Sequence, residues 1–547
     1  MKSFAATLAA FARVFANRNV RNVQIAGIAS TLAIWSYGVA LPVYAYHSGG
    51  ARAVSLLFFA RFVLAALAAP WLGLVADRWS RRRVMLTADL IRTGILVAMT
   101  VVASTGGSAY LVYVLAVSAT IVGGVYPPAQ AALMPSLVNS PDELTAANLV
   151  GNTIASVGMF VGPAIAGVLL ALSGPASVFG LTAGLVIASV AFVALVPADS
   201  PPERVGERVA FLPELTAGFR TVLHRPALRV VIGLSTAQTT VEGAVEVLLV
   251  VLAIRVLDAG NSGVGWLDVA MGVGSILGAL VVAAIAARRR LAAGFGLGVL
   301  LWGAPIAVAA AVSSLAPALV LFGIIGVGAM LCQVNSVTLL QRSAENEVLG
   351  RVFAVLESLM LASLAIGALL AAPLVSALGP RGALLATGLF LPVLLVPLWP
   401  SLRRIDAETV IAEEPLELLR RIEIFAQLPE PVLERLAKAA TAVSATAGQP
   451  VVEKGEVGQH FYVIATGRAA VELDDGGTRE LGHGDFFGEI ALLRAVPRTA
   501  TVRALEPLQL YAVERDEFLL AVTGHGPSLA AAENIVTTRL PAGALSG

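Results

Sequence analysis

The sequence is poor in charged residues and in the side chains that enzymes use for catalysis. Asp, Glu, Lys and Arg make up 13% of the 547 residues, against roughly 25% in a typical soluble domain. The single cysteine, Cys332, excludes an intramolecular disulfide and a thiolate metal site, and its apolar surroundings favour a buried, inert thiol. The five histidines are scattered, and no catalytic or metal-ligating constellation is recognisable. We therefore expect neither an enzyme nor a metal site.

Apolar residues, by contrast, dominate the chain. They make up 57% of it, and the mean hydropathy of +0.83 excludes an ordinary soluble protein. Apolar runs of roughly 20 residues, the length that crosses a bilayer, recur about twelve times between residues 23 and 400. The net charge of +1 gives no indication of nucleic acid as a partner. These features predict an all-α polytopic membrane protein whose main partner is the lipid bilayer.

Arginines in the loops indicate the orientation of the spans. Clusters such as 81–83, 288–290 and 403–404 lie in loops that alternate with loops of few basic residues. Because basic residues mark the cytoplasmic side, we expect both termini in the cytoplasm and the chain in a bacterial inner membrane. The longest inside loop follows the sixth span, so it divides the spans into two six-helix halves and is expected to contain a surface helix.

The composition changes abruptly after Pro400, where charged residues become frequent. A helical pattern is followed by short apolar alternations with turn glycines, which predicts a cytoplasmic α+β domain built on a β-roll with flanking helices. At the other end, the first residues resemble an amphipathic in-plane helix without a cleavage site. The expected organisation is an N-terminal amphipathic segment (1–21), a first six-helix bundle (22–197), an inter-half loop (198–227), a second bundle (228–402), a linker (403–415) and the soluble domain (416–547).

The second inside loop carries the most specific motif of the membrane part. Residues 73–82 read Gly-Leu-Val-Ala-Asp-Arg-Trp-Ser-Arg-Arg, which resembles the signature between spans two and three of the major facilitator superfamily. Runs at 88–92 and 126–135 are similar to its siderophore- and macrolide-exporting branch. The resemblance implies a carrier whose inner-face charges latch one conformation, although the arginines alone would also satisfy the positive-inside rule. Around 288–290 the second half lacks the acidic partner of this signature. The expected latch residues are Gly73, Asp77, Arg78, Arg81, Arg82, Asp89 and Arg92, with Glu357 also assigned to the inner face.

Several ionisable and polar groups lie within the spans themselves. Arg61, Glu242, Glu246 and Asp268 all fall in the outer half of the bilayer at helical rise. Since such groups are costly in lipid, they are candidates for proton coupling, and a static pair between Arg61 and a carboxylate is the equal alternative. Other polar and aromatic side chains are candidates for a substrate cavity, although helix packing would explain each of them as well. These candidates are Trp35, Tyr37, Gln238, Gln333 and Asn335, together with Trp302.

The soluble domain contains a long contiguous motif. Phe-Gly-Glu-Ile-Ala-Leu-Leu at 487–493, followed by Pro-Arg-Thr-Ala-Thr-Val at 497–502, resembles the phosphate-binding cassette of cyclic-nucleotide-binding domains of the catabolite-activator type. The resemblance implies that Glu489 accepts the ribose 2′-hydroxyl and that Arg498 binds the cyclic phosphate. A roll that has lost its ligand is the alternative. The implied site comprises Phe487, Gly488, Glu489, Ile490, Ala491, Arg498, Thr499 and Ala500.

Taken together, these patterns predict a proton-coupled exporter of a small lipophilic compound, regulated by a cyclic nucleotide. We expect cAMP rather than cGMP, although Thr499 is compatible with either base. No other cofactor is expected. Two alternatives stay open, a nucleotide-responsive membrane sensor that transports nothing and a lysolipid flippase of the same fold.

Overall fold

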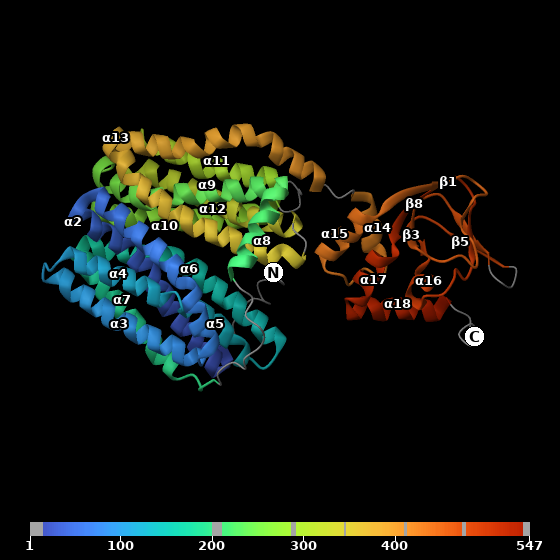
Figure 1. Cartoon of the computed structure of the whole chain (residues 1–547), viewed down its shortest axis with the longest axis horizontal. Helices are drawn as coiled ribbons and strands as arrows, with labels where there is room; N and C mark the ends of the chain where they lie inside the picture. The colour runs from blue at the N-terminus through green and yellow to red at the C-terminus, as the bar shows by residue number, and fades with distance from the viewer. Residues whose placement is uncertain are drawn as a thin grey trace. The chain divides into compact units, whose positions relative to one another are not determined.

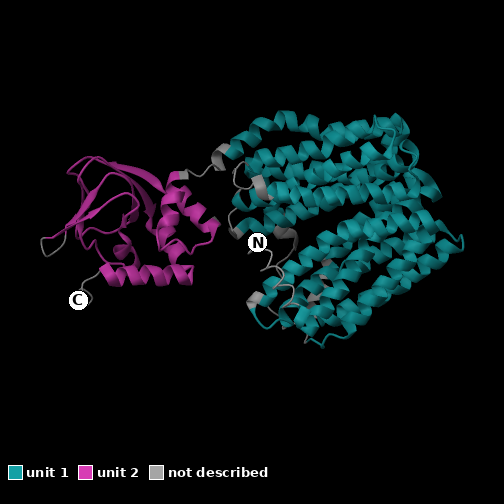
Figure 2. Cartoon of the chain, turned by 180° about the vertical axis from the view of Figure 1, so that it is seen from behind, with its two compact units in different colours: residues 1–408 teal, residues 409–547 magenta. Residues whose placement is uncertain are grey.

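The computed structural model describes residues 15–199, 211–285, 291–343, 346–409, 413–472 and 477–539. The chain divides into two compact units, Met1–Glu408 and Thr409–Gly547 (Figure 2). The N-terminal segment expected at 1–21 lies largely outside the described residues.

Unit 1 is helical throughout its described part. The helices of its first half lie together, and those of its second half form a second group (Figure 1). The first half contains α2 (Arg18–Arg78), α3 (Arg81–Ser104), α4 (Ala109–Gly123), α5 (Tyr126–Leu133), α6 (Pro141–Ser173) and α7 (Pro175–Ala194). Helix α8 (Phe211–His224) follows it in the chain. The second half contains α9 (Pro226–Val251), α10 (Gly260–Ile285), α11 (Leu291–Ala309), α12 (Leu315–Ser343) and α13 (Asn346–Thr409).

Nine helical segments in the described part are long and apolar enough to cross a membrane. Two of these segments each consist of two helices joined at glycines. Helix α2 bends at Gly49 and Gly50, and α13 bends at Gly379. Gly50 and Gly379 have φ of 64° and 71°, values that favour glycine. With their arms counted separately, and with α9 included, the segments correspond to the twelve crossings expected from the sequence.

Small residues allow the helices of unit 1 to approach closely. A Cβ on Gly265 of α10 would lie 2.7 Å from the Cα of Gly167 on α6, so these two backbones meet at the junction of the halves. On the other side of α6, a Cβ on Gly162 would lie 2.5 Å from the Cβ of Trp35 on α2. The glycine pattern of α6 therefore serves close helix packing with a neighbour on each side.

The helix α13 extends farther than the sequence indicated. It continues to Thr409, with Ile405 and Asp406 buried, so the first residues of the expected linker 403–415 are the end of the last membrane helix. Likewise, most of the described part of the expected loop 198–227 is helix α8, whose Val222 is buried.

Unit 2 is a β-roll with flanking helices, as expected. Its two antiparallel sheets have the strand orders β1-β8-β3-β6 and β2-β7-β4-β5. Phe425, Phe461 and Phe518 form an aromatic cluster between the first sheet and the helices. The strands are β1 (Thr441–Ala445), β2 (Pro450–Val452), β3 (His460–Thr466), β4 (Ala469–Glu472), β5 (Thr478–Leu481), β6 (Phe486–Phe487), β7 (Thr501–Ala504) and β8 (Leu508–Glu514), and the helices are α14 (Glu413–Arg421), α15 (Glu430–Ala439), α16 (Glu489–Arg494), α17 (Arg515–Thr523) and α18 (Gly526–Arg539).

Candidate transport cavity and nucleotide site

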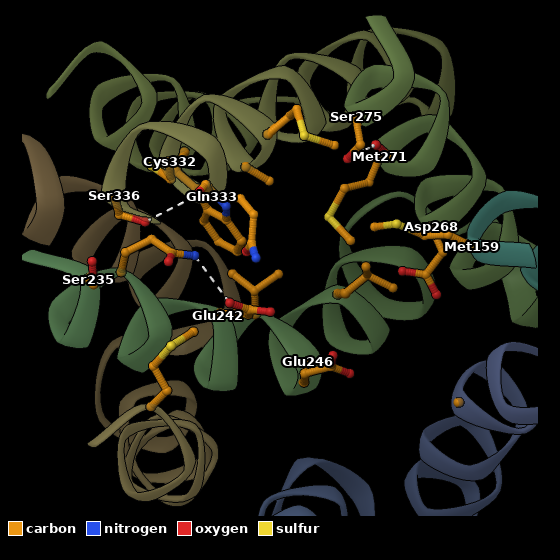
Figure 3. Close-up of a pocket in the computed structure, with 18 of the residues that line it drawn as sticks. Met159, Ser235, Glu242, Glu246, Asp268, Met271, Ser275, Cys332, Gln333 and Ser336 are labelled. Atoms are coloured by element: carbon orange, nitrogen blue, oxygen red, sulfur yellow. Dashed lines mark hydrogen bonds between the residues drawn. The ribbon is translucent and has the colours of Figure 1, made fainter. Parts of the chain in front are cut away.

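A cavity of about 380 Å³ lies within unit 1, mostly between helices of the second half (Figure 3). Helices α9 to α13 form most of its wall, and Gly38, Pro42 and Met159 contribute from the first half. Its polar lining consists of Ser235, Gln238, Glu242, Glu246, Asp268, Ser275, Trp302, Gln333, Ser336 and Glu357.

Three of the four proposed proton-coupling residues line this cavity. Glu242 and Glu246 lie one turn apart on α9, and Asp268 faces the same space from α10. Nε2 of Gln238 donates a hydrogen bond of 3.1 Å to Oε2 of Glu242. The structure therefore brings these carboxylates together from two helices.

Arg61, the fourth candidate, is not part of the cavity wall. Its Nε donates to Oγ1 of Thr120 at 3.0 Å, and its guanidinium lies over the rings of Tyr37 and Phe58 at 5.5 Å and 5.2 Å. The ion pairs of the described residues include none between Arg61 and a carboxylate. In this conformation the expected static pair between Arg61 and a carboxylate is therefore not formed among the described residues.

The expected substrate-cavity residues divide into two groups. Gln238 and Gln333, together with Trp302, line the cavity, whereas three others do not. Trp35 packs against the glycines of α6, the hydroxyl of Tyr37 donates to the carbonyl of Ala116, and Nδ2 of Asn335 donates to the carbonyl of Leu331. These three serve helix packing in this structure, because hydropathy alone does not reveal which helix face meets a neighbour.

Glu357, in contrast, lines the cavity although the sequence did not predict it there. The sequence placed it with the inner-face latch, but the structure places it in the cavity wall on α13. Ser235, whose oxygen is buried without a hydrogen-bond partner, also lines the cavity and has no distinctive sequence signal.

The inner-face latch is visible only in part, since the side chains of Gly73, Asp77 and Arg78 lie outside the described part. Nη2 of Arg82 donates to the carbonyl of Ala194 at 2.7 Å, at the end of α7. The first turn of α3 is bound by Asp199, an acid that the sequence did not single out. Its carboxylate accepts from Oγ of Ser80 at 2.6 Å and from the amides of Arg81 and Arg82 at 2.7 Å and 3.1 Å.

The hydrogen bonds around Asp199 also affect its ionisation. Partial burial by itself would raise the pKa of this carboxyl, but the hydrogen bonds from Ser80 and the α3 amides outweigh it and lower the pKa. Asp199 is therefore a charged cap on the N-terminus of α3.

Asp89 and Arg92 form a buried ion pair within the first half. Nη1 of Arg92 lies 3.1 Å from Oδ1 of Asp89. The other carboxylate oxygen accepts from Oγ of Ser189 on α7 at 2.7 Å, and Ser189 in turn bonds the hydroxyl of Tyr126 at 3.1 Å. The network joins α3, α5 and α7, so in this conformation it stabilises one half and does not cross to the other.

The second half contains a counterpart of the Asp199 cap. Asp406, near the end of α13, accepts from the amides of Ala292 and Ala293 at 2.8 Å and 2.9 Å, at the start of α11. In each half, an acid at the end of the sixth span or just after it thus caps the third span. The sequence motif gave no sign of this partner, because it lies more than a hundred residues after α11 begins.

In unit 2, Gly488 and Arg498 define the centre of the expected nucleotide site. Gly488 has φ of +98°, and a Cβ there would lie 2.6 Å from Nη1 of Arg498, so only glycine fits. Arg498 is 6% exposed, and its guanidinium donates to the carbonyls of Gly488 at 3.1 Å and His460 at 2.7 Å. No ion pair of the described residues involves it.

The guanidinium of Arg498 is therefore a buried cation without a neutralising carboxylate at ion-pair distance. Burial lowers its pKa, but an arginine side chain keeps its charge at any physiological pH. Beside it, the ring of Tyr462 lies 5.8 Å away and stacks on Phe487 at 5.1 Å. A site of this kind suits a small anion, because a phosphate would supply the missing charge.

Glu489 begins α16 and is 1% exposed. Its Oε1 accepts from Nη1 of Arg539, in the last described turn of α18, at 2.9 Å. Its Oε2 is buried and has no partner among the described residues. Arg539 also donates to the carbonyl of Phe486 at 3.0 Å and lies 4.4 Å from that ring, contacts that the sequence motif did not indicate.

The remaining residues of the cassette lie close in the chain to Glu489 and Arg498. Phe487 and Ala491 are buried, whereas Ile490 and Ala500 are half-buried and Thr499 is exposed. Thr499, next to Arg498 in the chain, is thus not part of the buried core of the site.

A two-halved helical bundle with an acidic internal cavity, joined to a β-roll with a buried arginine, defines a membrane transporter with an appended ligand-binding domain. The chain belongs to the Major Facilitator Superfamily, whose sequence profile matches residues 24–359. The profile of the Cyclic nucleotide-binding domain matches residues 442–523. The protein is thus a multi-pass membrane protein of this transporter family with a cyclic-nucleotide-binding domain.

Individual relatives agree with this division. The multidrug efflux pump Tap of Mycolicibacterium fortuitum is 29% identical over 376 residues, 66% of this chain and 90% of the pump. A cGMP-dependent protein kinase of Eimeria tenella is 36% identical over 118 residues, 21% of this chain but only 12% of the kinase. The crystal structure of a POT family transporter in complex with a thioalcohol-conjugated peptide matches with a TM-score of 0.56 at 14% identity. The match covers 70% of this chain and 96% of the POT transporter chain, and at this identity it shows the shared fold alone.

Proposed function

We propose that the protein is a proton-coupled exporter of small lipophilic compounds in a bacterial inner membrane, with both termini in the cytoplasm. The observation that carries this proposal is the convergence of Glu242, Glu246 and Asp268 on one internal cavity. Carboxyl groups in such a place can exchange a proton between the two sides as the cavity opens alternately. The similarity to a multidrug efflux pump over most of that pump's length supports the direction of transport.

Reconstitution into proteoliposomes tests this function. With an imposed pH gradient, addition of a transported lipophilic dye should cause a proton flux that stops when the gradient is collapsed by an ionophore. A panel of dyes that moves without any dependence on the gradient would contradict proton coupling. Movement of lysolipids in place of dyes would favour the flippase alternative, and nucleotide binding without any transport would favour the sensor.

We further propose that a cyclic nucleotide regulates the transporter through residues 416–547. The buried, unneutralised Arg498 beside the unpaired Oε2 of Glu489 supports a ligand that carries both an anionic phosphate and a ribose hydroxyl. We take cAMP as the ligand ahead of cGMP. Because Thr499 is exposed and could serve either base, calorimetric titration of the full-length protein with both nucleotides decides between them.

The short chain connection between the two units also suggests how the signal reaches the transporter. Only residues 410–412 separate the end of α13 from the start of α14. A nucleotide-induced change in the helices at 416–440 would therefore act directly on the end of α13, where Asp406 caps α11. We propose this cap as the route of regulation, and a coupling of about 1–3 kcal/mol would be typical.

A further inference from the structure

His47 joins the two halves of unit 1 at the outer end of the first span. It lies in the first arm of α2, two residues before the bend at Gly49. Its Nε2 lies 2.6 Å from Oδ1 of Asn261, in the first turn of α10, so one hydrogen bond connects side chains that are 214 residues apart in the chain. Neither residue lines the cavity described above.

Other contacts hold the halves together on the same side. Just after the bend of α2, Oγ of the buried Ser55 accepts a hydrogen bond of 3.2 Å from the amide of Ala372 on α13. The backbones of Gly167 on α6 and Gly265 on α10 meet nearby in the chain, one turn after Asn261. The two halves are therefore in contact on the outer side, and a carrier that opens outward must break these contacts.

The bond between His47 and Asn261 depends on the protonation state of the imidazole. An amide oxygen only accepts, so Nε2 must carry a proton. A neutral imidazole provides that proton in one of its two tautomers, whereas an imidazolium always provides it, and its charge strengthens the hydrogen bond. Histidine changes its charge between about pH 5 and 8, so the strength of this contact should depend on pH in that range.

The imidazole of His47 is exposed, so its charge follows the pH of the outer solution. The ring of Tyr46 lies beside it, with the ring centroids 6.5 Å apart. None of the ion pairs among the described residues involves His47, so no carboxylate fixes its charge. The ionisable groups on the elements around the contact are Tyr46 and Arg52 of α2, Tyr113 of α4, and Arg255 and Asp258 between α9 and α10.

We propose that the bond between His47 and Asn261 is a pH-sensitive outer latch, which holds the outer side of the carrier closed when the outer solution is acidic. The inference rests on the proposed function, since it takes from it the orientation of the chain and the alternate opening of the cavity. Protonation of His47 should favour the closed state by about fivefold, the difference between a neutral hydrogen bond and one to a charged group. At higher pH the latch is weaker, and the outer side opens more often.

Hydrogen–deuterium exchange of the purified full-length protein in detergent tests the outer latch without any transport. The peptides to follow cover residues 42–56 and 257–268, at the two sides of the bond. Labelling times are scaled to cancel the intrinsic pH dependence of amide exchange. We expect exchange in both segments to be about fivefold slower at about pH 5.5 than at about pH 8, because closed outer ends protect their amides.

Three variants distinguish a pH-sensitive latch from a merely structural contact. His47→Gln keeps a donor for Asn261 but cannot gain a charge, so exchange in both segments should lose its pH dependence. Asn261→Asp places a carboxylate opposite the imidazole, so the pH dependence should move to higher pH. His224→Gln, at the other histidine of unit 1, is the matched control and should leave the pH dependence as it is.

Two results would overturn the proposal: exchange that does not change with pH in the unmodified protein, and a pH dependence that persists in His47→Gln. A pH dependence that does not move in Asn261→Asp would also overturn it, so the test does not rely on one variant. Because the experiment needs neither a substrate nor a proton gradient, failure of the outer latch leaves the proposed exporter intact. A pH-dependent latch in a protein without gradient-driven transport would contradict the proposed function and not the latch.

Discussion

Arg539 and Glu489 form an ion pair that ties the last described turn of α18 to the first residue of α16, with Nη1 and Oε1 2.9 Å apart. The pair occupies only one oxygen of the carboxylate and leaves Oε2 buried and without a partner. Since Arg539 is also held by the carbonyl and the ring of Phe486, it fixes the direction in which the free oxygen points.

This relationship predicts that Arg539 positions Glu489 for the ribose hydroxyl. Replacement by glutamine should weaken cAMP binding to the full-length protein by about tenfold, the loss of one hydrogen bond to a charged group. Calorimetric titration measures the effect, and Arg479→Gln on the exposed face of β5 is the matched control. Tighter binding by the Arg539 variant would show instead that the ion pair competes with the nucleotide.

Arg498 should be essential to nucleotide binding. Arg498→Ala removes the cation that the phosphate needs, so we expect an affinity loss of at least about a hundredfold. Arg498→Lys should also bind poorly, because a single ammonium group cannot bond the carbonyls of Gly488 and His460 and a phosphate in the same geometry. Titration with cAMP and cGMP measures both variants, and near-normal binding by Arg498→Ala would place the ligand elsewhere.

The cavity carboxylate Glu246 should be needed for gradient-driven transport. Glu246 lines the cavity one turn of α9 after Glu242, so Glu246→Gln should reduce gradient-driven dye transport about tenfold or more, whereas facilitated exchange without a gradient should persist. Arg61→Gln should alter the pH dependence of transport rather than abolish it. Fluorescence transport assays in proteoliposomes distinguish these results. Equal loss of exchange and of driven transport would indicate a structural role for Glu246.

The local parts of this architecture were predictable from the sequence, and the long-range parts were not. The nucleotide cassette is contiguous, so its motif indicated Gly488 and Arg498 directly. The partner of Glu489, in contrast, lies 50 residues away on α18. The membrane spans followed from hydropathy, but hydropathy did not separate Trp35 and Tyr37, which pack between helices, from Trp302, which faces the cavity. Such distinctions depend on how helices are rotated against one another, which only the packed bundle determines.

Asp199 should stabilise the first half in a pH-dependent way. Its pKa is lowered in the folded protein, so its contribution is present above the ordinary value of 3.8 and is lost as the pH falls through the lower folded value. Asp199→Asn should therefore cost about 1 kcal/mol, as for the loss of a helix cap, at neutral pH and little in strong acid. Thermal unfolding in detergent at several pH values measures this, and a pH-independent difference would contradict the role of the charge.

Asp406 occupies the same capping position in the second half, but it lies next to the connection with unit 2. If its cap transmits the nucleotide signal, Asp406→Asn should leave cAMP affinity unchanged and make the transport rate insensitive to cAMP. Asp199→Asn is the matched control, because it removes the equivalent cap at a position distant in sequence from unit 2. This variant should not change the ratio of the transport rates measured with and without cAMP. The two quantities are measured by titration and by proteoliposome transport on the same preparations. A normal cAMP response in Asp406→Asn would mean that the signal enters the bundle by another contact. Loss of the response in both variants would mean that the response depends on the stability of the bundle and not on this cap.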